Sequence, residues 1–213
     1  SDAVLDAILS QDPESRVACE TMITGLDSKK LKVIISGEIT TSAKIDYNDI
    51  VNQTLKEIGY LEEYDLSTLI KPQSKHIAQG VDSNDIHDQG AGDQGLMFGF
   101  ACDETPELMP LPIVLSHSLA KQLAKIRKEE IFKGLCPDGK SQVTIEYDSD
   151  SNPVEVKKVV MATQHIDMIK NGQFNNEESE HAFIKENIIK HVILPVLKRY
   201  DTISFENNLN GSF

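Results

Sequence analysis

The sequence predicts an α+β fold. Segments with helical spacing of apolar residues and segments rich in β-branched residues follow one another without the strict alternation of a doubly wound sheet. The 213 residues are enough for one large domain or two small ones. With 39% hydrophobic and 26% charged residues, the composition is that of a globular protein. We therefore expect ordinary hydrophobic cores.

The first part of the chain predicts one helix followed by two strands. Residues 1–9 show the helical pattern, which stops at Asp12-Pro13. Residues 16–22 and 31–36 are expected to be strands, and the second of them (LKVIIS) is rich in β-branched residues. The intervening GLDSKK is typical of a turn.

A second helix is expected over 46–58, with Gly59 directly after it as a left-handed C-terminal cap. Residues 61–95 show little periodicity and predict a long loop with one short strand near 66–70. Loops of this length are often functional lids in compact proteins.

The second half predicts a helix, two strands and a long final helix. The helix is expected over 116–128. The strands are expected over 143–147 and 154–163, joined by a DSDSNP turn. The last helix should run over 177–199, with a bend at Pro195.

Charge and cysteine content exclude several classes of protein. The formal net charge of -13 argues against a nucleic-acid binder, which would normally present a basic face. The sequence contains no run of about 18 apolar residues, the length that would predict a membrane span. Three distant cysteines without a CxxC pair are typical of a reduced, cytoplasmic protein rather than a disulfide framework.

The segment DQGAGDQGLMFGFA, residues 88–101, is dense in small residues. Its glycines permit positive φ angles and close approach of a ligand to the backbone, beside the carboxylate of Asp93. The spacing is similar to GxGxxG, but no convincing strand precedes it, so the dinucleotide motif is weak. From these residues alone, an ordinary tight turn is an equally good interpretation.

The stretch PDGK places Asp138 and Lys140 two residues apart, just before a predicted strand. Residues at i and i+2 of an extended segment point the same way. One ligand could therefore meet a carboxylate suited to ribose hydroxyls and an ammonium suited to phosphate. An ordinary exposed turn is the simpler interpretation of this stretch in isolation.

Eight short strings, distributed in one order over the chain, carry a family resemblance. They are SDAVLDAIL (1–9), VACET (17–21), GEITTSA (37–43), EIGY (57–60), GAGDQGLMFG (90–99), LMPLPI (108–113), PDGKSQVT (137–144) and TQH (163–165). Through these strings the chain resembles the S-adenosylmethionine synthetase (methionine adenosyltransferase) family over essentially its whole length.

The resemblance implies a transferase that joins the sulfur of L-methionine to the 5′ carbon of ATP. The bound triphosphate is then hydrolysed to phosphate and pyrophosphate. Mg²⁺ is implied as the ion that neutralises the phosphates and K⁺ as an activator. A thioether needs no general base, so such a site requires alignment and charge stabilisation rather than a Ser-His-Asp arrangement.

The resemblance also assigns roles to seven residues. The expected methionine contacts are Glu38, Gln73 and Asp93; the expected ATP contacts are Asp138 (ribose), Lys140 (phosphate) and Phe213 (adenine). Glu20 matches the glutamate of the potassium site. Lys140 and Asp93 are the expected catalytic residues.

The implied fold consists of repeated α+β domains with mixed sheets and helices on one face, built from discontinuous segments. Residues 1–70 are expected to form part of the central domain, and 71–103 a lid loop with a strand-bearing segment of the C-terminal domain. Residues 104–213 are expected to form most of an N-terminal-type domain. Flat apolar sheet faces should bury against a second subunit, in a homodimer or a dimer of dimers.

Departures from the family pattern leave two interpretations. Ser212 stands where the family's GRF string has an arginine, and the lid string QSPDI is replaced by QSKHI at 73–77. Family segments with a magnesium-binding aspartate, a histidine and phosphate-binding lysines have no counterpart, so the isolated chain is expected to make no S-adenosylmethionine. The chain is then either a fragment of a working enzyme or a non-catalytic relative that keeps the fold and subunit interface as a binding or regulatory partner.

Overall fold

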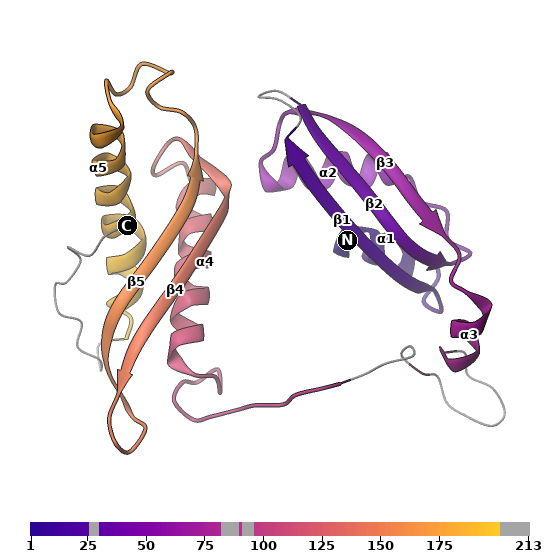
Figure 1. Ribbon diagram of the computed structural model, residues 1–213, viewed down its shortest axis with the longest axis horizontal. Helices are drawn as coiled ribbons and strands as arrows, with labels where there is room; N and C mark the ends of the chain where they lie inside the picture. The colour runs from indigo at the N-terminus through magenta and orange to yellow at the C-terminus, as the bar shows by residue number, and fades with distance from the viewer. Residues whose placement is uncertain (26–29, 82–89, 91–95, 201–213) are drawn as a thin grey trace. The chain divides into compact units, whose positions relative to one another are not determined.

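The computed structural model describes residues 1–25, 30–81, 90 and 96–200. The chain divides into two compact units, Ser1–Phe98 and Gly99–Phe213 (Figure 1). Each unit has its own sheet, helices and hydrophobic core, so the expected α+β class is confirmed. No helix of the described residues is both long and apolar enough to cross a membrane.

The first unit contains a three-stranded sheet, here called sheet A. In chain order its elements are α1 (Asp2–Leu9), β1 (Arg16–Gly25), β2 (Lys30–Thr40), α2 (Tyr47–Ile58), β3 (Glu63–Lys71) and α3 (Lys75–Val81). Strand β2 is central; it pairs with β1 antiparallel and with β3 parallel. A parallel pair needs a crossover connection, and α2 provides it.

Sheet A buries one face against α1 and α2, which lie behind the strands in Figure 1, and leaves its other face open. The core residues alternate along β2 and recur at helical spacing in the two helices. They are Val4, Ile8, Val33, Ile35, Ile39, Val51 and Leu55. Because side chains alternate along a strand, the even-numbered residues of β2, including Glu38, belong to the open face.

Helix α2 is capped at both ends, at its C-terminus by Gly59 as the sequence predicts and at its N-terminus by Asp46. The Asp46 carboxylate accepts hydrogen bonds from the backbone N–H groups of Asn48 (2.8 Å) and Asp49 (3.2 Å). Gly59 follows with φ 107°, and its N–H donates to the carbonyl of Leu55. These caps satisfy backbone groups that every helix end leaves without partners.

A glycine lies where β1 and β2 approach each other next to Glu38. Gly37 has φ +148°, and a Cβ at this position would lie 2.0 Å from the carbonyl oxygen of Ala18. Only glycine fits such a contact without moving the neighbouring strand. The close approach fixes the backbone that carries the Glu38 carboxylate.

The second unit contains a two-stranded antiparallel sheet, here called sheet B. Its elements are α4 (Leu111–Lys128), β4 (Leu135–Tyr147), β5 (Pro153–His165), α5 (Glu177–Ile188), a π-helix (Ile189–Ile193) and α6 (Leu194–Leu197). The core joins α4 and the final helical stretch to one face of the strands. Its most deeply buried members include Leu115, Leu119, Ile126, Met168, Val192, Ile193 and Val196.

The last helical stretch widens into the π-helix just before Pro195, where the sequence predicted a bend. Proline has no N–H, and in a regular α-helix its ring would clash with the carbonyl four residues earlier, that of His191. In the structure, this carbonyl accepts a hydrogen bond from Gln122 Nε2 of α4 at 3.0 Å. The wider turn thus accommodates the proline without leaving that carbonyl unpaired.

Strand β4 begins at Leu135 rather than at residue 143, so the PDGK stretch lies in a strand instead of preceding one. Gly139 and Lys140 pair with Thr163 and Ala162 of β5. Pairing with β5 extends the strand through residues whose individual preferences are for turns.

Helix α4 begins at Leu111 rather than at residue 116. Pro112 is well placed in a first turn, and the Glu104 carboxylate accepts from the backbone N–H of Leu111 at 3.0 Å. That N–H bond is the first cause of the lowered pKa of Glu104. The apolar run LPIVL therefore belongs to a helix whose cap is seven residues away in sequence.

Candidate functional site

Four polar residues meet at one end of sheet A: two were predicted from the sequence, and two are added by the structure. Register places Arg16 opposite Thr40 across β1 and β2, and Glu38 opposite Lys71 across β2 and β3. Strands β2 and β3 are parallel, so their carboxyl ends lie at the same sheet edge. Gln73 follows two residues after β3 and joins this edge. We call Arg16, Glu38, Lys71 and Gln73 the sheet-end cluster.

The side chain of Gln73 is held in one orientation. Its Oε1 accepts a hydrogen bond from Arg16 Nε at 2.9 Å, and its backbone N–H donates to Thr40 Oγ1 at 3.1 Å. Arginine can only donate, so the amide oxygen must face Arg16. The amide Nε2, which has no hydrogen-bond partner in the described part of the chain, is the donor that Gln73 can offer to a ligand.

The Glu38 carboxylate forms an ion pair with Lys71. Glu38 Oε1 lies 3.1 Å from Lys71 Nζ, and the two side chains are 29% and 74% exposed. The carboxylate is thus the less accessible partner, while the lysine reaches it from solvent. The sheet-end cluster therefore combines an acceptor for a cation with an amide donor for an anion.

The hydroxyl groups that follow Glu38 have a structural role. Asp12 Oδ2 accepts from the backbone N–H of Ser42 (2.8 Å), from Ser42 Oγ (2.9 Å) and from Thr41 Oγ1 (3.2 Å). These bonds, led by the one from the Ser42 backbone, lower the pKa of Asp12 to about 2. They tie the loop after β2 to the end of α1.

The predicted potassium ligand lies on the same open face. Glu20 is exposed on β1, opposite Ser36 of β2. Across the described residues, no three His, Cys, Asp or Glu side chains are grouped so that they could hold a metal ion. Glu20 by itself offers one carboxylate to a cation, which is fewer oxygen ligands than the octahedral set that Mg²⁺ takes.

The predicted ATP contacts Asp138 and Lys140 lie together on β4 of the second unit. Lys140 Nζ is 3.8 Å from Asp138 Oδ2, and the side chains are 80% and 63% exposed. The backbone N–H of Asp138 donates to Gln164 Oε1 at 3.3 Å, which joins the PDGK and TQH strings. The two charges are accessible to a ligand on this strand.

Two predicted site residues, Asp93 and Phe213, lie outside the described residues, as does Ser212. The five described site residues fall in both units. Glu20, Glu38 and Gln73 belong to the first, and Asp138 and Lys140 to the second.

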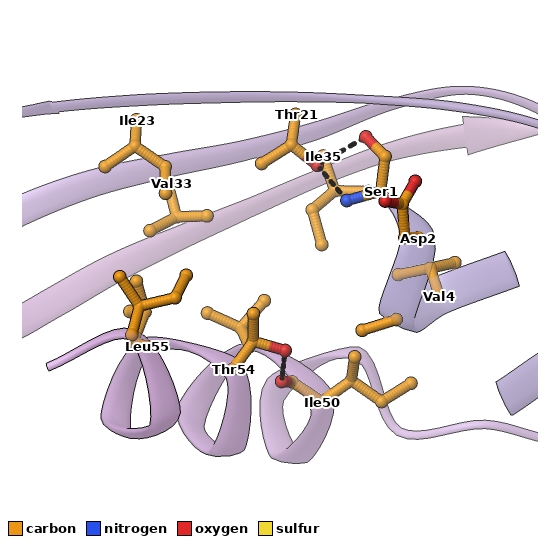
Figure 2. Close-up of a pocket in the computed structure, with 13 residues that line it drawn as sticks. Ser1, Asp2, Val4, Thr21, Ile23, Val33, Ile35, Ile50, Thr54 and Leu55 are labelled. Atoms are coloured by element: carbon orange, nitrogen blue, oxygen red, sulfur yellow. Dashed lines mark hydrogen bonds between the residues drawn. The ribbon is translucent and has the colours of Figure 1, made fainter. Parts of the chain in front are cut away.

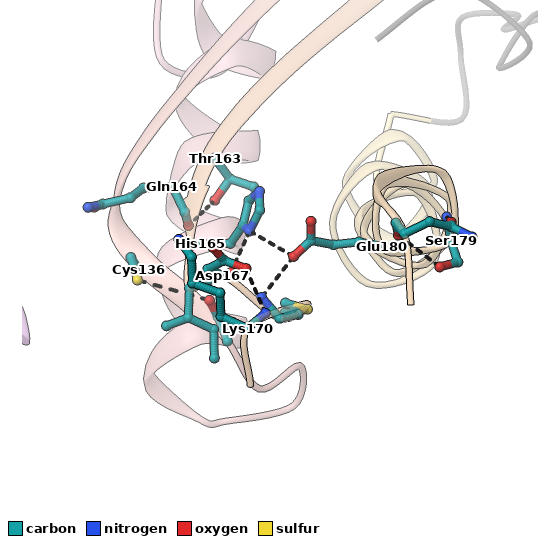
Figure 3. Close-up of polar contacts among 12 residues, drawn as sticks. Cys136, Thr163, Gln164, His165, Asp167, Lys170, Ser179 and Glu180 are labelled. Atoms are coloured by element: carbon teal, nitrogen blue, oxygen red, sulfur yellow. Dashed lines mark hydrogen bonds and ion pairs between the residues drawn. The ribbon is translucent and has the colours of Figure 1, made fainter. Parts of the chain in front are cut away.

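The histidine of the TQH string belongs to a polar cluster that connects β5 to α5 (Figure 3). His165 Nδ1 donates to the carbonyl of Ile166 at 2.8 Å and lies 4.0 Å from Glu180 Oε1. The same Glu180 oxygen accepts from the backbone N–H of Met168 at 2.8 Å. Because Met168 is fully buried, we interpret this cluster as a structural connection.

A separate apolar cavity of about 280 Å³ lies between sheet A and its two helices (Figure 2). Its walls include Val4, Ile23, Val33, Ile35 and Leu55. These residues belong to the helix-covered face, opposite the sheet-end cluster. Its lining is mostly apolar, with Ser1, Asp2, Thr21 and Thr54 as the polar members, and none of the predicted site residues that the structure describes lines it.

Sequence reasoning missed Arg16 and Lys71. Arg16 directly precedes the VACET string, and Lys71 comes two residues before Gln73. Neither belongs to a quoted motif. Lys71 could have been identified from the register of the parallel strands β2 and β3, but this register cannot be read from the sequence.

Two family models match the chain. The model of the S-adenosylmethionine synthetase N-terminal domain matches residues 1–81, and that of the central domain matches residues 88–213. These domain names differ from the expected ones, which placed 1–70 in the central domain and 104–213 in an N-terminal-type domain. The described residues of 71–103 contain the end of β3 and α3 but no further strand.

Curated relatives named S-adenosylmethionine synthase match most of the chain. The protein of Prochlorococcus marinus (strain MIT 9301) is 49% identical over 211 residues, which are 92% of this chain and 49% of the relative. That of Oleidesulfovibrio alaskensis is 48% identical over 93% of this chain and 49% of its own length. That of Staphylococcus epidermidis (strain RP62A) is 45% identical over 100% of this chain and 55% of its own length. The chain spans about half the length of these relatives.

Proposed function

Because the chain belongs to the S-adenosylmethionine synthetase family, we propose that it takes part in joining L-methionine to ATP. The observation that carries this proposal is the match of two family models to consecutive parts of the chain. The proposed products are S-adenosylmethionine and, after hydrolysis of the triphosphate, phosphate and pyrophosphate. Mg²⁺ and K⁺ belong to the same proposal as the ions that assist the reaction.

The sheet-end cluster supports a methionine site. We assign the Glu38 carboxylate to the α-ammonium of methionine and the Gln73 Nε2 donor to its carboxylate. The Arg16–Gln73 bond (2.9 Å) supports the assignment of Nε2 to the ligand, because it directs the amide oxygen of Gln73 toward Arg16 and away from the ligand. An α-amino acid carries both charges, so a site with acceptor and donor at one sheet edge suits it.

Lys140 and Asp138 support an ATP site in the second unit. We assign the ammonium of Lys140 to a phosphate oxygen and the carboxylate of Asp138 to ribose hydroxyls. Asp93 and Phe213 keep their proposed places beside methionine and against adenine. In such a reaction the protein aligns sulfur with the 5′ carbon and stabilises the leaving triphosphate, since the thioether itself is the nucleophile.

Methionine binding by the chain tests the first assignment. Glu38→Gln removes the charge but keeps the shape, so isothermal titration calorimetry should show methionine binding at least about ten-fold weaker, a typical loss for a charged hydrogen bond. Asp65→Asn is the matched control, because Asp65 forms the corresponding β2–β3 ion pair with Lys32 on the same open face. If both variants bind methionine like the wild type, Glu38 is not the ammonium site.

ATP binding tests the second assignment. Lys140→Ala should weaken ATP binding by about 1.5–3 kcal/mol, the value of a charged hydrogen bond. Lys158→Ala removes another exposed cation from the neighbouring strand and should leave ATP binding unchanged. Equal losses in the two variants would indicate a nonspecific charge effect.

Product formation is measured in the same preparations by mass spectrometry with ATP, methionine, Mg²⁺ and K⁺. We expect no turnover by the 213-residue chain, because it spans about half the length of its relatives. Multiple turnovers would show that the residues present here form a complete site.

A further inference from the structure

The ammonium group of Lys71 lies on the carboxylate that the proposed function assigns to the substrate. Lys71 Nζ is 3.1 Å from Glu38 Oε1. A lysine ammonium and the α-ammonium of an amino acid are chemically alike: each has one positive charge and three N–H donors. Both therefore compete for the same oxygen atoms.

We propose that Lys71 sets the affinity for the amino-acid substrate by competing with its α-ammonium for Glu38. This inference rests on the proposed function of the sheet-end cluster. Lys71 is then neither a contact of the substrate nor a catalytic residue. It is an internal competitor that an amino acid must displace before it binds.

The strand register explains why this lysine reaches Glu38. Lys71 is the last residue of β3 and lies directly opposite Glu38 of β2, on the open face of sheet A. The fixed backbone keeps its ammonium within reach at a high effective concentration. With 74% of its side chain exposed, however, Lys71 can move into solvent when another cation arrives, whereas Glu38 is only 29% exposed.

The energetics limit the effect to a modest one. Exposed ion pairs of this kind are weak and screened by water. Competition by Lys71 should therefore weaken substrate binding by about two- to five-fold, which is enough to measure. Gln73 is held by Arg16 and not by Lys71, so recognition of the substrate carboxylate should be unaffected.

The test compares methionine binding by the wild-type chain, Lys71→Met and Lys71→Arg in calorimetric titrations. Lys71→Met keeps the apolar stem but removes the cation, so methionine should bind about two- to five-fold more tightly. Lys71→Arg keeps the cation and should show no such gain. 4-(Methylthio)butanoate, which is methionine without its amino group, should bind the wild type and Lys71→Met equally.

Lys32→Met is the matched control. Lys32 also forms an ion pair between β2 and β3, with Asp65 at 2.7 Å, at the far end of the same face. Its loss removes the same charge from the same sheet but leaves the Lys71–Glu38 ion pair intact. Methionine affinity should therefore stay at the wild-type value. Backbone amide NMR spectra of all variants establish that sheet A is intact.

Each outcome decides between the two proposals. Equal or weaker methionine binding by Lys71→Met overturns the inference, and if Glu38→Gln still weakens methionine binding as expected, the proposed methionine site stands. A gain that also appears in Lys32→Met overturns the inference in favour of a general charge effect. Absence of methionine binding in the wild type and in Lys71→Met overturns both.

Discussion

Asp12 is the residue whose protonation has the clearest consequence for the first unit. Its carboxylate accepts three hydrogen bonds from Thr41 and Ser42, and it holds the loop that leaves the sheet-end cluster. These donors favour the charged form and lower the pKa from 3.8 to about 2. A folded-state pKa below the ordinary value means that ionised Asp12 stabilises the folded state.

We predict that Asp12→Asn lowers the urea midpoint of the first unit at neutral pH, and that its difference from the wild type shrinks in acid. The sign follows from the lowered pKa: the contribution is complete above the ordinary value of 3.8 and is lost as the pH falls through about 2. Urea unfolding of both proteins between pH 7 and pH 2 measures the difference.

Asp6→Asn is the control for this prediction. It removes a carboxylate from the exposed side of α1, and the described contacts include no hydrogen bond to that carboxylate. Its effect on the urea midpoint should be small. If the two variants show the same pH dependence, the bonds to Thr41 and Ser42 do not stabilise the folded unit.

Among the elements, the π-helix depends on a side chain from another helix. Gln122 Nε2 donates to the carbonyl of His191 at 3.0 Å, and Gln122 Oε1 accepts from Arg199 at 3.1 Å. One half-buried amide thus joins α4 to two points of the final helical stretch. A carbonyl left without a donor at such a place costs free energy.

We predict that Gln122→Glu lowers the free energy of unfolding of the second unit by about 1–2 kcal/mol, because glutamate offers no donor to the His191 carbonyl. Urea unfolding followed by circular dichroism measures the loss. Amide exchange should accelerate over residues 189–193. Lys121→Glu, a charge change at an exposed neighbour on α4, is the control; a loss as large as that of Gln122→Glu would contradict the assigned bond.

The elements differ in how far the sequence predicts them. Helix α2 was predicted nearly to its ends because the helical spacing of its apolar residues and Gly59 after it are local signals. The first half of β4 was not, because Pro137, Asp138 and Gly139 individually favour turns. The strand is held there by the pairing of Leu135 and Gly139 with β5, with an irregularity between these two residues. Element type follows local pattern, whereas strand length follows partners that are distant in sequence.

The same limit applies to the candidate site. Glu38 and Gln73 were predicted from motifs, and the structure brings both to one sheet edge. Arg16 and Lys71 were missed because their positions depend on how β1, β2 and β3 are aligned. Charge neighbours across strands are non-local, so a motif search does not find them.

At the scale of the whole molecule, the two separate hydrophobic cores predict that each unit has its own free energy of unfolding. Ile35 is buried in the first core, and Leu119 in the second. We predict that Ile35→Ala and Leu119→Ala each lower the unfolding free energy of their own unit by about 2–5 kcal/mol, through lost burial and the cavity left behind.

Native-state hydrogen exchange measured by mass spectrometry distinguishes the two units in one experiment. Protection should fall in the mutated unit and persist in the other, so the two variants serve as controls for each other. A uniform loss of protection over both units in either variant would show that the chain unfolds as one cooperative body.

The open face of sheet A predicts self-association. Met22 (54% exposed) and Leu69 (65%) are large apolar side chains on this face, with Ile34 between them on β2. Burying such side chains against a second copy would be favourable by about 1.5–3 kcal/mol each. This expectation agrees with the proposed homodimer.

We predict that Leu69→Lys weakens self-association at least about ten-fold, as measured by sedimentation equilibrium. Leu61→Lys is the control, since Leu61 is 84% exposed but lies before β3 and off the sheet face. A wild-type chain that is monomeric at micromolar concentration would contradict the predicted interface directly.

The π-helix also makes the final helical stretch tolerant of a change in length. A π turn closes each hydrogen bond over one residue more than an α turn does, so Ile189–Ile193 holds one residue in excess of what a regular helix needs. Deleting the exposed Lys190 would let this turn close as an α turn while Val196 and Leu197 keep their buried side of the helix, but the Pro195 ring would then meet the carbonyl four residues before it. The same deletion in the middle of α5 would rotate every later residue by about 100° and carry Val192 and Ile193 out of the core. Among the helical positions of this stretch, the π-helix is therefore where a homologous chain that has another residue in place of Pro195 can lack one residue and keep its later core residues on the buried side of the helix.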